Sequence, residues 1–146
     1  MPLIHGEDIV RAVCTDKWDG ERLSPSLFVG EGLSVSRLSL IPLSEHWAMF
    51  RDHVEDPPER RLEMIAEINV GHLHQIGLGY TTPTKLTVEP KPEAWNPAHA
   101  EIVERITRGL ANVILRHLKK HVPPSARDDS SGRPRRDGWT GQEILE

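Results

Sequence analysis

The sequence lacks a second cysteine, a long apolar run and an excess of basic residues, and each absence excludes a class of protein. Cys14 is the single cysteine among 146 residues, so no disulfide can form within the chain. No run of 18 apolar residues is present, which excludes a transmembrane helix. The opening MPLIHGEDIV has no charged stretch followed by an apolar one, so no signal peptide is predicted. Together these features predict a cytoplasmic protein.

The charge balance is mildly acidic, with 18 basic against 22 acidic residues and a net charge of −4. Proteins that bind nucleic acid or anionic membrane surfaces carry a basic excess, so neither partner is expected. The chain also contains no G-x-S-x-G, no P-loop, no dinucleotide-binding glycine pattern and no zinc cluster. We therefore predict no cofactor, and no complete catalytic motif identifies a reaction.

The composition changes near residue 123. Residues 1–122 have the composition of a single compact domain that is long enough to bury a core. Residues 123–146 contain almost no apolar residue before Trp139, and this composition predicts a polar, flexible tail. Trp139 and the apolar residues that follow it resemble a short docking motif. Trp139 is therefore a candidate partner-binding residue.

Hydrophobic periodicity predicts an α+β fold. Strand patterns over about 33–40, 62–70 and 84–89 predict a small, mostly antiparallel sheet. Residues 6–15 and the segment that follows Ser44 are predicted to form short helices. This sheet is expected to pack against them and against one long C-terminal helix.

That long helix is the strongest pattern in the chain, and it is predicted over residues 97–121. Asn96 is a preferred N-cap residue, and Pro97 suits the first helical position. The apolar residues that follow fall within one stripe of the helix. His99 lies in the middle of that stripe, so we expect it to face the body of the protein as a neutral imidazole.

His99 is also the central candidate for a catalytic site. Serines and arginines surround the first predicted strand, and a Ser34–His99 pair with Arg22 would suit acyl or phosphoryl transfer. Asn96 and Arg37 are candidate binding residues. The alternative stays open: the serines cap turns, and His99 makes a structural hydrogen bond.

His72 and His74 have the spacing that places two imidazoles on one face of a strand, where they can share a metal with His99. Residues 56–76 are ambiguous, because a helical entry at Asp56-Pro57-Pro58-Glu59 competes with the strand pattern. We prefer a strand over 62–70 and a helical turn over 71–76. In a helix the two rings point apart, which disfavours the metal site.

Four segments carry a resemblance: ERLSPSLF, LSVSRL, INVGHLHQIGL and VEPKPEAWNPAHAEI. Their order over about residues 20–102 resembles small bacterial proteins of uncharacterised function, and it implies a bacterial source and one compact domain. The first functional hypothesis is a non-enzymatic accessory protein of a bacterial operon that binds a protein partner or forms a homo-oligomer. The alternative is a small hydrolase or transferase that uses His99 with Ser34 and Arg22, with or without a metal at His72 and His74.

Overall fold

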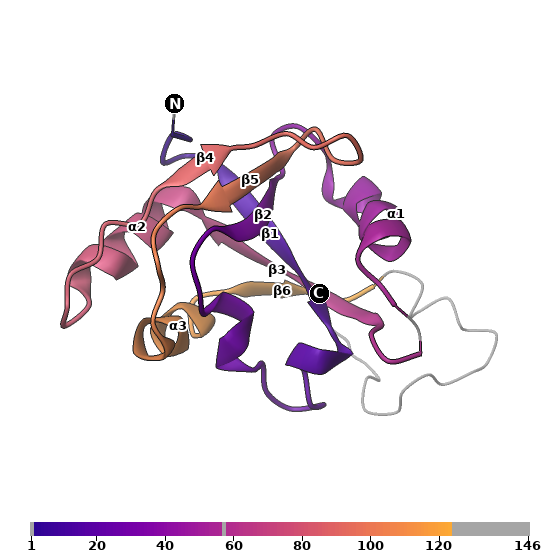
Figure 1. Ribbon diagram of the computed structural model, residues 1–146, viewed down its shortest axis with the longest axis horizontal. Coiled ribbons are helices and arrows are strands. Elements are labelled where there is room, and N and C mark those ends of the chain that lie inside the picture. The colour runs from indigo at the N-terminus through magenta and orange to yellow at the C-terminus, as the bar shows by residue number, and fades with distance from the viewer. Residues whose placement is uncertain (1, 57, 124–146) are drawn as a thin grey trace.

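The computed structural model describes residues 2–56 and 58–123, which form an antiparallel sheet of six strands with three α-helices (Figure 1). The strands are β1 Asp8–Cys14, β2 Leu33–Arg37, β3 Leu62–Asn69, β4 Val88–Pro90, β5 His99–Ile102 and β6 Lys119–His121. The α-helices are α1 Leu43–His53, α2 Val70–Gly79 and α3 Arg108–Leu115, and two 3-10 turns are η1 Thr15–Lys17 and η2 Pro25–Phe28. The spatial order of the strands is β4-β5-β2-β1-β3-β6, and each neighbouring pair is antiparallel.

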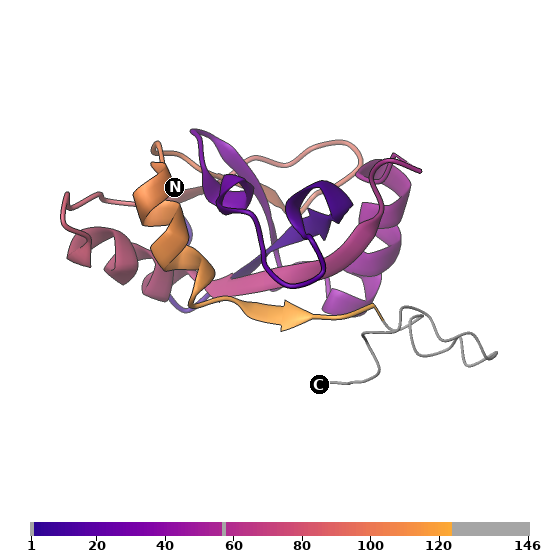
Figure 2. The ribbon, with the colours of Figure 1, turned by 90° about the horizontal axis from the view of Figure 1, so that it is seen from below.

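Both faces of the central strands are covered. On one face, residues such as Val13 and Ile102 pack with α2, α3 and η2 in the larger core. On the other face, Val10 and Ile65 pack with Trp47 and Phe50 of α1. Both ribbon views show α1 apart from α2 and α3, with strands of the sheet between them (Figures 1 and 2). Each central strand therefore buries successive residues on opposite sides.

Strands β1 and β2 pair over only two residues, and then they separate. Their register joins Ile9 to Arg37 and Val10 to Ser36. Beyond this point β1 continues beside β3, while β2 stays paired with β5 back to Leu33. Figure 1 shows the two strands diverging. We call the gap between residues 11–14 of β1 and residues 33–35 of β2 the fork, because the candidate site lies there.

The predicted long helix over residues 97–121 is wrong. Residues 93–96 form a tight turn in which the backbones of Glu93 and Asn96 exchange two hydrogen bonds of 3.0 Å. The chain then enters β5, in which Ala100 and Ile102 belong to the larger core and His99 lies on the opposite face. The helix begins later, where the Thr107 side chain accepts a hydrogen bond from the Leu110 amide. One apolar stripe in the sequence thus serves a strand and a short helix.

The prediction for residues 6–15 is also wrong, because this segment is β1 and not a helix. Ile9, Val10, Val13 and Cys14 are all buried, since the strand is covered on both faces. Such a strand shows no polar alternation, so periodicity does not distinguish it from a buried helix.

Other predictions hold. The strand over 62–70 is confirmed as β3, and the helical turn over 71–76 lies within α2. The side chain of Asn69 accepts a hydrogen bond from the His72 amide and so caps α2. The α+β class and the antiparallel sheet are confirmed. The predicted tail over 123–146, with Trp139, lies outside the described residues apart from its first residue.

Candidate functional site

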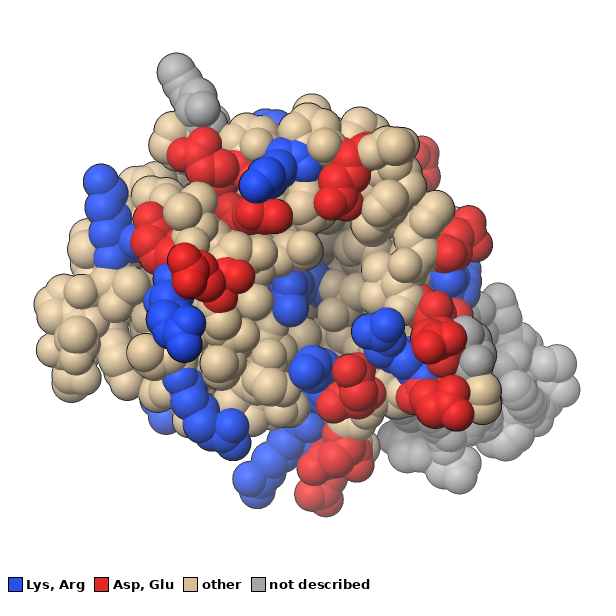
Figure 3. All heavy atoms as spheres, in the orientation of Figure 1, with Lys and Arg blue, Asp and Glu red and all other residues tan. Residues whose placement is uncertain are grey.

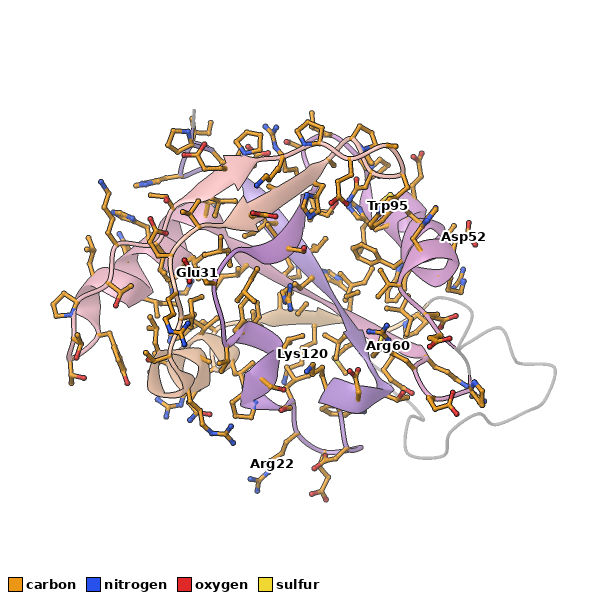
Figure 4. All side chains as sticks on the ribbon, viewed as in Figure 1. Arg22, Glu31, Asp52, Arg60, Trp95 and Lys120 are labelled. Carbon is orange, nitrogen blue, oxygen red and sulfur yellow. The ribbon has the colours of Figure 1, made fainter. Side chains whose placement is uncertain are left out.

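A pocket of about 240 Å³ opens at the fork, on the face of the sheet that α1 covers. Its lining comes from β1, η1, β2, the end of α1, the turn before β5 and His99 of β5, together with Leu27 of η2 and Arg60. Figure 3 shows this face hollowed beside α1, with blue basic side chains around the lower part of the hollow. Trp95 and Arg60 both line the pocket, and Figure 4 shows Trp95 above Arg60, both on the side of α1.

Ser34 and His99 meet at this pocket. The pairing of β2 with β5 places His99 opposite Ser36, so His99 and Ser34 lie on the same face of the sheet. The Nε2 atom of His99 is 3.1 Å from the Ser34 hydroxyl oxygen. His99 is only 4% exposed, while Ser34 is exposed. The predicted pair is therefore present in space, although its two residues are 65 positions apart.

The second ring nitrogen of His99 sets its tautomer. Nδ1 lies 2.8 Å from the backbone carbonyl oxygen of Lys91, which can only accept, so Nδ1–H donates to it. In the neutral ring this leaves Nε2 with a lone pair, which accepts from the Ser34 hydroxyl. The Glu93 carboxylate lies 3.8 Å from Nδ1 and is 42% exposed.

A second serine–histidine pair lies deeper on the same face. Ser36 and His46 are 1% and 0% exposed, and their Oγ and Nε2 atoms are 2.6 Å apart. His46 Nδ1–H donates to the Pro42 carbonyl oxygen, so Nε2 accepts from the Ser36 hydroxyl. Asn96, 1% exposed, donates to Ser36 Oγ and accepts from the Ala98 amide. Both hydroxyl roles of Ser36 are filled, so this buried network is structural.

The network corrects the interpretation of Asn96 as a helix cap, and it buries a histidine of α1. His46 lies on α1 and is buried, because this side of the helix packs against Ser36 of β2. Asn96 lines the pocket, but its side chain bonds Ser36 and Ala98 rather than capping a helix.

Burial of His46 predicts a pH-dependent stability. Burial disfavours the charged ring and lowers the pKa of His46 below its ordinary value of 6.5, although the Pro42 carbonyl and Glu45 act in the opposite direction. The unfolded chain therefore binds a proton that the folded chain does not, so the stabilisation is complete above pH 6.5 and is lost as the pH falls through the folded pKa. Urea unfolding between pH 7.5 and 5 should show stability falling, by up to about 1.4 kcal/mol per pH unit from this residue. His46→Gln should flatten that decline, and the exposed control His117→Gln should leave it unchanged.

Cys14 lines the pocket but is not a nucleophile. Burial and the nearby Asp16 carboxylate raise the pKa of its thiol to about 11, so it stays protonated at neutral pH. Cys14 is thus a free, buried cysteine that packs as a small apolar side chain.

Arg11 is the pocket residue that sequence reasoning missed. It lines the fork, where its Nε–H donates to the Leu27 carbonyl oxygen at 2.8 Å and Nη1 donates to the Ser34 carbonyl oxygen. Its Cζ atom lies 5.6 Å from the centre of the Phe28 ring. The available signal was a single arginine inside the otherwise apolar stretch IVRAVC.

Arg22 and Arg37 do not join the Ser34–His99 pair. Arg22 is exposed, lines a different pocket between η1 and η2, and points away from the fork in Figure 4. Arg37 forms an ion pair with Glu7, with 2.7 Å between Nε and Oε2. The Arg37 hydrogen bonds lower the pKa of Glu7. Arg37 therefore joins the end of β2 to the segment before β1.

The two metal candidates lie on α2, two positions apart, so their rings point in different directions. The His72 ring contacts His117, whereas His74 contacts His5 and donates to the Leu86 carbonyl oxygen at 3.3 Å. The structure does not bring either to His99. Within residues 2–56 and 58–123, no three His, Cys, Asp or Glu side chains are grouped so that they could hold a metal ion.

Among the described residues, no helix is long and apolar enough to cross a membrane. Comparisons with protein-family models, with curated proteins and with solved structures found no match for this chain. The function is therefore argued from the pocket and its side chains.

Proposed function

We propose that the protein is a small hydrolase or acyl transferase in which Ser34 is the nucleophile and His99 is the general base. The observation that carries the proposal is the 3.1 Å contact between Ser34 Oγ and His99 Nε2 in an open pocket. The hydrogen bond from Nδ1 to the Lys91 carbonyl oxygen supports it, because it holds the tautomer that a base requires.

The chemistry follows from these atoms. Ser34 Oγ attacks the carbonyl carbon of an ester, and its proton passes to Nε2 of His99. The tetrahedral intermediate collapses as the bond to the leaving oxygen breaks, and that oxygen takes the proton from Nε2. Water, deprotonated by the same nitrogen, then attacks the acyl carbon. The bond to Ser34 Oγ breaks, Oγ takes the proton back from Nε2, and the acyl group leaves as a carboxylic acid. No metal or cofactor is needed for this sequence.

Ser36 is the natural internal comparison. It has the same residue type on the same face, and it also contacts a histidine. Ser36 also lines the pocket, but it is 1% exposed, and its hydroxyl already donates to His46 and accepts from Asn96, so it is not free to attack an ester. Exposure, rather than the presence of a serine–histidine contact, therefore selects Ser34 as the reactive residue.

A fluorophosphonate probe tests the assignment, since it bonds to serines that a base has activated. Intact-mass and peptide mass spectrometry should find one adduct, on Ser34. Ser34→Ala should lose the adduct, and Ser44→Ala, which removes an exposed serine from α1, should keep it. A chain that stays unlabelled, or carries the probe elsewhere, would contradict the enzyme proposal.

The competing proposal is the non-enzymatic partner-binding protein. It rests on the composition of residues 123–146 and on Trp139, and on no contact in the pocket. An unlabelled Ser34 would favour it.

A further inference from the structure

We propose that the substrate of this pocket carries an oxyanion group, a carboxylate or a phosphate, and that Arg11 binds it. This inference rests on the proposed function, because it names the class of molecule on which Ser34 acts. Three features carry it: the fixed guanidinium of Arg11, its missing counter-ion and the other charges around the pocket.

The Arg11 guanidinium is held in place with hydrogen-bonding capacity to spare. Its bonds to the carbonyl oxygens of Leu27 and Ser34 use Nε and one N–H of Nη1. An arginine has five N–H donors, so three remain. Nη2 makes no hydrogen bond within residues 2–56 and 58–123. A planar fork with free N–H groups is suited to a carboxylate or phosphate, which accepts two parallel hydrogen bonds.

The charge of Arg11 is also without a carboxylate partner. In the described part of the chain, no Asp or Glu oxygen lies within 4.0 Å of its guanidinium nitrogens. Burial lowers the pKa of Arg11 to about 10, so the group remains charged at neutral pH while it has lost part of its hydration. Charges removed from water are normally paired, and a bound anion would supply the partner here.

Basic side chains also outnumber acidic ones in the whole lining of the pocket. Lys17 and Arg60 reach the pocket beside Arg11, against the acidic Asp16 and Glu93. Lys17 Nζ is 3.1 Å from Ser26 Oγ, which leaves it further donors. Cationic groups therefore outnumber acidic ones around a volume of about 240 Å³, a size that suits a small molecule.

The position of Arg11 connects the anion to the chemistry. Arg11 donates to the backbone carbonyl of Ser34, the same residue that carries the nucleophilic hydroxyl. An oxyanion bound at the guanidinium is thus held beside Ser34, and it would orient a short substrate against Oγ.

Binding is measured first, in the full-length Ser34→Ala protein, so that no turnover is required. Sodium phosphate and sodium succinate are titrated at constant ionic strength, with chloride as the replaced ion, and backbone amide shifts are followed by NMR. We expect saturable shifts at the fork with at least one anion, and the anion that produces them identifies the bound group as phosphate or carboxylate.

Adding Arg11→Gln should weaken binding about 10- to 100-fold. Arg105→Gln, at an exposed arginine outside the pocket lining, is the matched control. The inference is overturned if neither anion produces shifts at the fork, or if the shifts persist unchanged in Arg11→Gln.

A matched pair of esters tests the substrate class in the protein with Ser34 intact. The 4-nitrophenyl esters of butyric acid and of succinic acid differ by a terminal carboxylate. We expect kcat/KM to favour the anionic ester about tenfold or more, and Arg11→Gln to remove that preference. Lys17→Gln and Arg60→Gln should each reduce the preference in part, which keeps the test open if Arg11→Gln does not fold.

The two proposals fail in different ways. Turnover of both esters at equal rates, with no anion binding, overturns the inference and leaves the hydrolase proposal in place. Saturable, Arg11-dependent anion binding without acylation of Ser34 supports the anion site and overturns the hydrolase proposal.

Discussion

His99→Ala is expected to slow acylation of Ser34 by about 10²- to 10⁴-fold, the range that a positioned general base contributes. The physical reason is that Nε2 is the proton acceptor 3.1 Å from the hydroxyl. The rate is measured as release of 4-nitrophenol from an activated ester under single-turnover conditions. Adding imidazole should restore part of the rate, because the substitution leaves a ring-sized space beside Ser34. A structural histidine would show no such rescue.

Stability has to be followed in the same variant. His99 is buried and donates to the Lys91 carbonyl oxygen, so its removal should also cost about 1–3 kcal/mol of unfolding free energy. Comparison at a temperature where both proteins are fully folded separates the two effects. His117→Ala removes an exposed histidine and should change neither rate nor stability by much. A rate that falls only in proportion to the unfolded fraction would refute the role of His99 as a base.

Asn96→Ala should lower the free energy of unfolding by about 2–4 kcal/mol, because it leaves two buried groups with lost partners. The Ser36 oxygen loses a donor at 3.0 Å, and the Ala98 amide loses an acceptor at 2.9 Å. Ser36, Asn96 and Ala98 are all buried, so water does not replace these bonds. Urea unfolding followed by circular dichroism measures the change.

Two further variants test the prediction for Asn96→Ala. Asn112→Ala removes an exposed asparagine from α3 and should change stability by less than about 0.5 kcal/mol. Asn96→Asp keeps the acceptor for the Ala98 amide but loses the donor to Ser36 and adds a buried charge, so it should destabilise at least as much as alanine. If Asn96→Ala unfolds at the same urea concentration as the original protein, the buried network does not stabilise the fold.

The prediction for His99 shows how a correct expectation can rest on a wrong element. The helical pattern placed His99 on the same side as Ile102, facing the core. In β5 the two residues face opposite sides of the sheet, and His99 is buried all the same. Its surroundings therefore come from β2 and the turn before β5, and not from the core that holds Ile102.

The sequence predicted well those elements whose pattern lies within a few neighbouring residues. Alternation between Leu62 and Asn69 indicated β3, and the helical turn that follows it was expected. The sharpest local motif, Asn96-Pro97, misled because a good helix entry is also a good turn. Buried packing of residues 99–102 in the sheet then outweighed their helical pattern, since tertiary contacts contribute more than local preference.

The sequence by itself determined the α+β class and the strand β3 with its following helix, and it suggested Ser34 and His99 as a pair. Only the tertiary structure decided their meeting, because the register of β2 on β5 is set by long-range pairing. It alone distinguished exposed Ser34 from buried Ser36. The two serines lie on the same face of β2, and α1 places His46 against Ser36 only. It alone revealed Arg11, because the separation of β1 from β2 opens the space that its guanidinium enters.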